Sequence, residues 1–272
     1  MDEKTADDVG EAVGVGGSPP ELRWLPTAGG SLPVLDCPPD GQPRGAVVVL
    51  HDAAGATAHN DEVTRRFCPL GYRALAPRLY HRTTDRPLSY DDVDGMVENM
   101  RALNERDLLA DLGAVVDYLH GVGFADRSIA LVGFCMGGTI AFLGARHLNL
   151  GAAVTFYGGG IATSDFGMPP LLDLAPDLQT PWLGLYGDLD RLAPVEEVER
   201  LRAAAGSSPV PTALHRYAEA GHAFHSDIRP QMYHEASARD GWARTLAWLD
   251  QHLDRSNWDP AQRDPARQDP AH

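Results

Sequence analysis

The feature that most constrains this chain is the run Gly133-Phe134-Cys135-Met136-Gly137. The apolar residues 129–133 are typical of a buried strand, and residues 137–147 are typical of a helix. Glycines two residues before and two residues after a side chain let a strand and a helix approach each other through a sharp, strained turn. The run therefore predicts a nucleophile turn in which Cys135 stands at the usual position of a serine.

Cys135 is the cysteine for which we expect chemical reactivity. The turn places its sulfur at a helix N-terminus, where unpaired N–H groups and the helix dipole favour the thiolate. The alternative is a small cysteine buried in a glycine-rich turn, but the glycine spacing favours the reactive interpretation. Cys37, beside Pro38 in a predicted loop, and Cys68, in a helical pattern, are expected to be structural. Three cysteines without a C-x-x-C pair argue against a disulfide framework, so we expect free thiols.

Short apolar runs alternate with helical patterns along residues 21–254. Strands are expected at 46–51, 129–133, 152–157 and 182–187, with weaker candidates at 72–76 and 213–217. Helices are expected at 90–120, 137–147, 196–205 and 235–253. This alternation predicts one α/β domain with a doubly wound, mostly parallel sheet. Residues 1–20 lack periodicity, and residues 255–272 contain a proline every few positions, so both are expected to be disordered.

Two segments downstream of Cys135 supply the partners that a cysteine nucleophile needs. A base must take its proton, and an acid usually orients that base. The predicted strand at 182–187 leads into Asp188 and Asp190, and His222 follows the last strand candidate. Each residue alone is also compatible with a helix cap or a surface loop. The order nucleophile, acid, base nevertheless favours a catalytic triad of Cys135, Asp190 and His222.

These motifs resemble those of the dienelactone hydrolase family over about residues 30–250. GFCMGG is similar to the family's cysteine turn, YGDLDRLAP to its acid turn and GHAF to its histidine loop. The resemblance implies the α/β-hydrolase fold and a Cys–His–Asp triad that works without a metal or an organic cofactor. It implies that Cys135 is the nucleophile, His222 the base and Asp190 the acid, with Asp188 as the competitor for that last role.

The resemblance extends to the segment VVVLHDAAGATAHN, which is similar to the family's oxyanion loop. It implies that the backbone N–H groups of Ala53 and Met136 hold the developing oxyanion. Asp52 stands where the family commonly has a glutamate that contacts the resting thiol; capping of the following turn is its alternative role. Tyr157 and Phe224 are candidate pocket residues, and packing in the core is the alternative role of Tyr157.

The arginines with which the family grips a substrate carboxylate have no match in this chain. The segment after His222 reads Phe224-His225-Ser226-Asp227, and the segment before the long helical pattern reads Tyr90-Asp91-Asp92-Val93. Arg101, Arg191 and Arg229 are the candidates to replace the missing arginines.

Charge and composition narrow the partners and the location. The net charge of −15, from 23 basic and 38 acidic residues, disfavours nucleic acid and anionic membranes. No run approaches the roughly 20 apolar residues of a spanning helix, and the acidic N-terminus is unlike a signal peptide. We therefore expect a cytoplasmic protein that acts on a small molecule.

The function expected from the sequence is hydrolysis of an ester or lactone through a thioester intermediate. The alternatives are a non-catalytic binding or sensing protein on the same fold, and another Cys-dependent acyl-transfer enzyme. A metal site is disfavoured, because its candidate ligands match no metal-binding spacing; these are His51, Asp52, His59 and His81.

Overall fold

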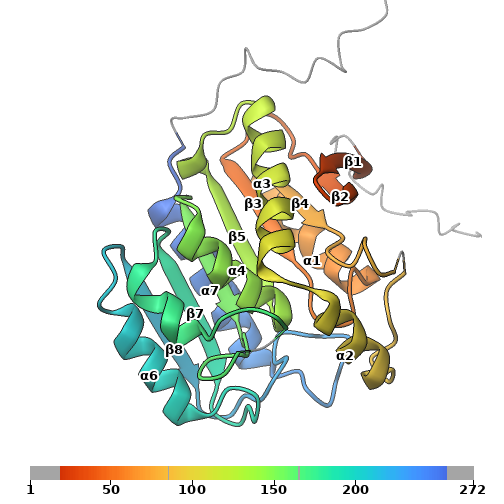
Figure 1. Ribbon diagram of the computed structural model, residues 1–272. Coiled ribbons are helices and arrows are strands. Elements are labelled where there is room, and N and C mark those ends of the chain that lie inside the picture. Colours follow the sequence, from red (N-terminus) through yellow and green to blue (C-terminus); the bar gives the residue numbers. More distant parts are fainter. Residues whose placement is uncertain (1–18, 85, 165, 256–272) are drawn as a thin grey trace, which may run out of the picture.

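The computed structural model describes residues 19–84, 86–164 and 166–255, and its strands form one sheet (Figure 1). The strand order is β1-β2-β4-β3-β5-β6-β7-β8. The strands are β1 (Glu21–Thr27), β2 (Gly30–Cys37), β3 (Gly45–Leu50), β4 (Tyr72–Pro77), β5 (Ile129–Phe134), β6 (Ala152–Phe156), β7 (Trp182–Gly187) and β8 (Thr212–Tyr217). β2 is antiparallel to both neighbours, and the other pairs are parallel. The predicted doubly wound, mostly parallel sheet is therefore confirmed.

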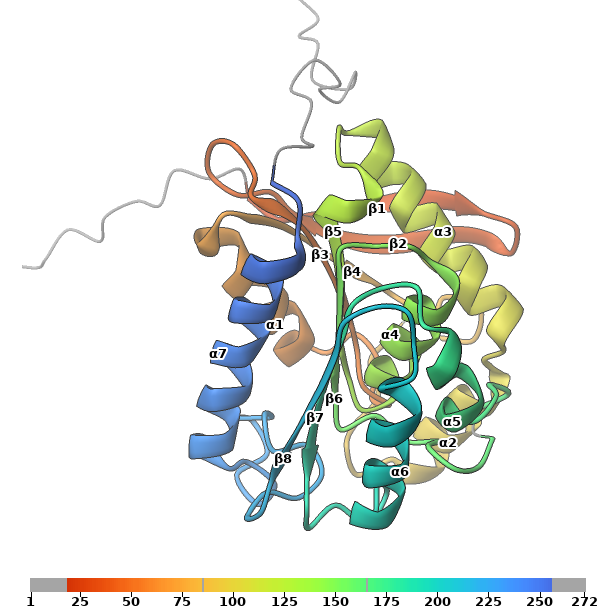
Figure 2. The same cartoon turned by 90° about the vertical axis from the view of Figure 1, so that its left-hand side faces the viewer.

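Helices cover both faces of the sheet. Figure 2 shows α1 and α7 on one face and α3, α4 and α6 on the other. The helices are α1 (Ala58–Phe67), α2 (Val93–Ala102), α3 (Glu105–Gly121), α4 (Met136–His147), α5 (Leu171–Leu174), α6 (Val195–Ala205) and α7 (Glu235–His252). Three short 3-10 turns accompany them: η1 (Cys68–Leu70), η2 (Asp126–Ser128) and η3 (Ala175–Asp177).

The central strands are apolar along their whole length because both of their faces are covered. Val48 and Leu131 pack into the core on the side of α3 and α4. Val49 and Val132, which follow them in sequence, pack on the side of α1 and α7. Successive side chains along a strand point to opposite faces of the sheet. Each continuous apolar run therefore contributes to two hydrophobic cores, one on each face.

The long helical pattern at 90–120 is two helices, and this part of the prediction was wrong. α2 ends at Ala102, Leu103 is extended, and α3 begins after Asn104. The side-chain oxygen of Asn104 accepts a hydrogen bond from the Asp107 N–H at 3.0 Å, which is the geometry of a helix N-cap. The predicted strands also omitted the hairpin of β1 and β2.

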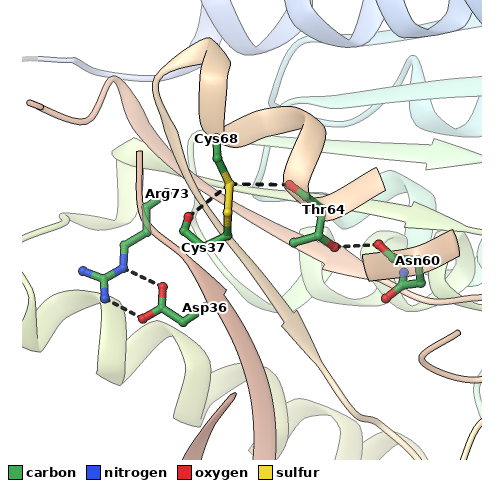
Figure 3. The surroundings of a disulfide bond; sticks show 6 residues. All are labelled: Asp36, Cys37, Asn60, Thr64, Cys68 and Arg73. Carbon is green, nitrogen blue, oxygen red and sulfur yellow. Dashed lines mark hydrogen bonds and ion pairs between the residues drawn. A yellow bond between two sulfur atoms is a disulfide. The ribbon is translucent and has the colours of Figure 1, made fainter. Parts of the chain in front are cut away.

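Cys37 and Cys68 form a disulfide, so the expectation of free thiols is wrong for these two residues (Figure 3). Cys37 is the last residue of β2 rather than part of a loop, and Cys68 begins η1 directly after α1. Their Cα atoms lie 6.3 Å apart, although 31 positions separate them in sequence. Cys135 is free.

The disordered arm and tail expected at 1–20 and 255–272 lie outside the described residues, apart from 19–20 and 255. In the described part of the chain, none of the helices combines the length and the apolar character that a bilayer span requires.

Candidate active site

The candidate site lies where parallel strands end at one edge of the sheet. Cys135 follows β5, Asp190 lies three residues after β7, and His222 follows β8. The candidate oxyanion loop, beginning at His51, follows β3. Because β3, β5, β6, β7 and β8 run in the same direction, their carboxyl ends bring these segments together.

The turn at Cys135 requires its glycines for steric reasons. Cys135 itself has φ 55° and ψ −119°, which is a strained conformation for a residue with a side chain. A Cβ atom at Gly133 would lie 1.9 Å from the carbonyl oxygen of Gly137, and one at Gly137 would lie 2.2 Å from that of Leu50. Strand, turn and helix therefore fit together only with glycine at both positions.

His222 bridges the sulfur and a carboxylate. Its Nε2 lies 3.1 Å from Cys135 Sγ, and its Nδ1 lies 2.8 Å from Asp190 Oδ2. The other carboxylate oxygen of Asp190 accepts the Leu192 N–H at 2.8 Å, so the carboxylate is held from both sides. The competitor Asp188 forms a two-pronged ion pair with Arg216, at 2.7 Å for each contact, so both of its carboxylate oxygens are bonded to a residue other than His222.

The protonation of His222 follows from these neighbours. Burial alone would lower the pKa of the imidazole, because it penalises the charged ring. The Cys135 sulfur and the Asp190 carboxylate outweigh burial and raise the pKa of His222 to about 10. The ring thus lies between two groups that favour its positively charged form.

The two candidate oxyanion donors are on two backbone segments, the start of α4 and the loop after β3, which approach each other closely at Gly137. Met136 is the first residue of α4, where an N–H has no partner inside the helix. Ala53 lies in a turn that is closed by hydrogen bonds from Gly55 N–H to Asp52 O, at 3.0 Å, and from Ala54 N–H to Asp52 Oδ1, at 2.9 Å. Across the described ranges, the Ala53 N–H donates to no acceptor.

Asp52 caps its own turn and binds Tyr90. Oδ1 accepts from Ala54 N–H, and Oδ2 accepts from the Tyr90 hydroxyl at 2.8 Å. The structure gives Asp52 no hydrogen bond to Cys135, whose polar side-chain partner is His222. The capping role is therefore the one that this geometry supports.

The two aromatic pocket candidates differ in their surroundings. The ring of Tyr157 packs edge-on against His222 with 5.2 Å between centroids, and its backbone has φ 41°. Phe224 is completely buried and packs on Tyr157 and Tyr217. Phe224 thus belongs to the core behind Tyr157, and Tyr157 borders the catalytic histidine candidate.

Tyr90 and Tyr80 were missed by sequence reasoning because they lie in the irregular segment between β4 and α2.

A small cavity beside the site is lined by Asp52, His59, Asn60, Tyr90, Tyr157 and Ser226, among others. The guanidinium of Arg229 lies 4.6 Å from the centre of the Tyr90 ring, and it forms no ion pair with a described residue. Arg101 and Arg191 are exposed.

The four metal-ligand candidates do not form one cluster. His59 pairs with Asp227, and His81 pairs with Asp111, each at 3.1 Å. His51 Nε2 accepts the Leu79 N–H at 3.1 Å. Among residues 19–84, 86–164 and 166–255, no three His, Cys, Asp or Glu side chains are arranged to hold a metal ion.

Comparison with known proteins identifies the family of this chain. Residues 33–253 match the model of the dienelactone hydrolase family. A relative from Yersinia pestis named "Putative carboxymethylenebutenolidase" is 37% identical over 233 residues, covering 84% of this chain and 86% of the relative. A protein of the same name from Escherichia coli strain K12 is 36% identical, with coverage of 84% and 85%.

Solved structures agree with the sequence comparison. The crystal structure named "Putative Dienelactone Hydrolase" from Klebsiella pneumoniae has a TM-score of 0.79 and 34% identity, covering 86% of this chain and 98% of that chain. The acylaminoacyl peptidase of Pyrococcus horikoshii is similar in fold alone, with a TM-score of 0.66, 11% identity and coverage of 88% and 42%. This chain has the α/β-hydrolase fold and belongs to the dienelactone hydrolase family, a family of hydrolases.

Proposed function

We propose that this chain hydrolyses carboxylic esters or lactones through a triad of Cys135, His222 and Asp190. The observation that supports this most is the continuous contact from sulfur to imidazole to carboxylate, at 3.1 Å and 2.8 Å. A thiolate next to an imidazolium is a nucleophile at neutral pH, and the aspartate holds the ring in the required orientation. A binding or sensing protein makes no use of this arrangement, whereas another Cys-dependent acyl-transfer enzyme would use the same triad and differs from a hydrolase in the group that accepts the acyl group.

In the first step, the thiolate of Cys135 attacks the carbonyl carbon and forms a C–S bond. The carbonyl oxygen becomes an oxyanion, which the N–H groups of Ala53 and Met136 stabilise. When the intermediate collapses, the C–O bond to the leaving oxygen breaks, and that oxygen takes the proton from the His222 imidazolium. The products of this step are an acyl thioester, a neutral imidazole and an alcohol, which in a lactone stays attached to the acyl group.

In the second step, neutral His222 removes a proton from water, and the resulting hydroxide attacks the thioester carbon. The C–S bond breaks and Cys135 leaves as a thiolate beside the regenerated imidazolium. The carboxylic acid product releases its own proton to solvent. The cycle restores both members of the ion pair and needs no cofactor.

The substrate class that we propose is a small ester or lactone with a carboxylate near the scissile bond. The support is Arg229, whose guanidinium stacks on Tyr90 next to Asp52 and forms no ion pair with a described side chain. A guanidinium is suited to bind a carboxylate through two parallel hydrogen bonds. The relatives named for carboxymethylenebutenolidase activity are compatible with this proposal.

The proposed function is tested by Cys135→Ala, assayed with activated esters and lactones that either carry or lack a carboxylate. We expect turnover to fall by about three orders of magnitude or more, because removal of a nucleophile leaves only binding and the oxyanion donors. Mass spectrometry of rapidly quenched wild-type enzyme is expected to show an acyl group on Cys135. Unchanged turnover in the alanine variant would exclude the proposed triad.

We also propose a cytoplasmic location, and one observation opposes this expectation. Disulfides persist mainly in oxidising compartments, and Cys37 and Cys68 are paired here.

The net charge of −15 remains the argument against nucleic acid as a partner.

A further inference from the structure

His51 is a buried histidine directly after β3, and its hydrogen bonds identify which nitrogen is protonated. Its side chain is almost completely buried, with 1% of the residue exposed. Nε2 lies 3.1 Å from the Leu79 backbone nitrogen, and Nδ1 lies 2.8 Å from the Asp52 carbonyl oxygen. A backbone N–H can only donate, so Nε2 is the bare nitrogen and Nδ1 donates its hydrogen to Asp52 O. Burial lowers the pKa of His51, in agreement with a neutral ring.

The Asp52 carbonyl belongs to the same peptide group as the Ala53 N–H. A trans peptide is planar, so its C=O and its N–H point in opposite directions. Two donors hold the oxygen end of this peptide: His51 Nδ1–H, and the Gly55 N–H at 3.0 Å. Fixing the oxygen end fixes the direction of the N–H end, which is the proposed oxyanion donor.

The next peptide group is held in the same way. The Tyr80 hydroxyl donates to the Ala53 carbonyl at 3.0 Å, and Ala54 N–H donates to Asp52 Oδ1 at 2.9 Å. The Tyr80 hydroxyl also lies 3.2 Å from Met136 Sδ, but its single hydrogen goes to the carbonyl, which is the better acceptor. The rings of Tyr80 and His51 pack together with 5.2 Å between centroids.

The hydrogen bonds therefore form a chain from Leu79 N–H through His51 to the Asp52–Ala53 peptide. Hydrogen bonds in such a chain polarise one another, and a carbonyl that accepts two of them makes its own peptide N–H a stronger donor. The imidazole thus acts on the Ala53 N–H from the side opposite to the substrate.

We propose that His51 is a positioning residue for acyl transfer, which orients and polarises the Asp52–Ala53 peptide so that the Ala53 N–H stabilises the oxyanion. This inference rests on the proposed function, because it presupposes an oxyanion formed by attack of Cys135. It assigns a role to a histidine whose hydrogen-bond partners are two backbone groups, Leu79 N–H and Asp52 O, and not the Cys135 sulfur.

The test compares His51→Leu, which has no donor or acceptor, with His51→Gln, whose amide has both. Thr180→Val is a matched control: the Thr180 side chain also accepts from one backbone N–H, that of Leu150, and donates to one backbone carbonyl, that of Leu148. Thr180 precedes β7, at the end of the sheet opposite to the candidate site. The control therefore removes the same kinds of bond without touching the oxyanion loop.

Three quantities are measured on each variant. The first is kcat and KM for the ester that the wild type hydrolyses best. The second is the inhibition constant of the aldehyde analogue of that ester's acyl group, which adds to the thiol and places its oxygen in the oxyanion position. The third is the rate at which iodoacetamide alkylates Cys135, a displacement that needs the thiolate but forms no oxyanion.

For His51→Leu we expect kcat and aldehyde affinity to fall together by about 10- to 100-fold, less than the full loss of an oxyanion donor. KM and the alkylation rate are expected to stay within about two-fold of the Thr180→Val control, because the ion pair of Cys135 and His222 is intact. His51→Gln is expected to recover most of kcat. If His51→Leu does not fold, His51→Met, which also lacks a donor for Asp52 O, replaces it.

Two outcomes overturn the inference. One is a kcat and an aldehyde affinity in the donor-free variants that match those of Thr180→Val. The other is an alkylation rate that falls in parallel with kcat, which would place the effect on the sulfur rather than on the oxyanion. Failure of the proposed function is a separate result, since it requires that Cys135→Ala retain wild-type turnover whatever the His51 variants do.

Discussion

At the scale of single residues, His222 is held between a sulfur and a carboxylate, and its titration reports both. Nuclear magnetic resonance of the imidazole nitrogens is expected to show a protonated ring through neutral pH, with a pKa of about 10. Replacing Cys135 with alanine removes one of the groups that raise this pKa, so we expect the ring to titrate at a lower pH. Asp190→Asn is expected to have the same direction of effect, and Asp188→Asn, whose carboxylate binds Arg216, none. A wild-type ring that is neutral at pH 7 would contradict the ion pair.

The same pKa has a consequence for stability. The folded-state value lies above the unfolded value of about 6.5, so the imidazolium favours the folded state. This contribution is complete below about pH 6.5 and disappears as the pH rises through about 10.

Sequence reasoning could identify some residues of the candidate site and not others, for a physical reason. Cys135 was identifiable because steric contact restricts the flanking positions to glycine. Asp190 and His222 follow strands, and parallel strands bring their carboxyl ends together, so their order in the chain was informative. Tyr90 was missed and Arg229 was only one of three candidate arginines, because both residues lie in irregular segments. Their proximity depends on the path of two loops, which no local pattern of residues specifies.

At the scale of elements, the disulfide joins the end of β2 to the turn after α1, beside the strand pair of β2 and β4. We expect the double replacement of Cys37 and Cys68 by alanine to lower the free energy of unfolding by about 3 kcal/mol, because the unfolded chain loses a closed loop. Urea denaturation monitored by circular dichroism measures this change. Wild-type protein in a reductant is expected to resemble the variant, and kcat is expected to stay the same in both.

A free energy of unfolding that is equal with and without reductant would contradict this role of the disulfide. The pairing of Cys37 with Cys68 could not be predicted from the sequence, because 31 positions separate the two cysteines and no motif connects them.

The strands that could be predicted from the sequence are those that are covered by apolar side chains on both faces. β3, β5, β6 and β7 are buried on both faces, so each reads as a continuous apolar run. β1 lies at the edge of the sheet, and its exposed Leu22 and Trp24 interrupt any simple pattern. The break between α2 and α3 was missed because apolar spacing continues across Leu103, and only the capping bond of Asn104 marks the boundary.

At the scale of the whole molecule, we expect the buried, neutral His225 to contribute to the loss of stability in acid. His225 is 4% exposed, and burial lowers its pKa to about 3. Between pH 6.5 and 3, the unfolded chain binds a proton at this position that the folded chain does not. One such group lowers stability by about 1.4 kcal/mol for each unit of pH in this window.

We therefore expect the His225→Leu variant to lose less stability than the wild type as the pH falls below 6.5. Urea denaturation midpoints of both proteins at pH 7, 6, 5 and 4 measure this difference. The substitution is tolerable because His225 Nδ1 has no hydrogen-bond partner among the described residues, and its neighbours Phe134, Phe156 and Trp242 are aromatic. The urea midpoints of the wild type and the variant are expected to differ less at pH 7 than at pH 4. Parallel curves for the two proteins would show that His225 does not cause the acid sensitivity.

The close approach of Gly137 to Leu50 O joins the nucleophile turn to the end of β3, from which the oxyanion loop departs. No side chain lies between these two backbones, so a shift of one segment is transmitted to the other. This main-chain contact adds to the side-chain hydrogen bonds of the loop in holding the proposed oxyanion donors beside the nucleophile turn. The spacing between the sulfur and the proposed oxyanion donors is therefore a property of the folded backbone, because a backbone shift in one segment moves the other.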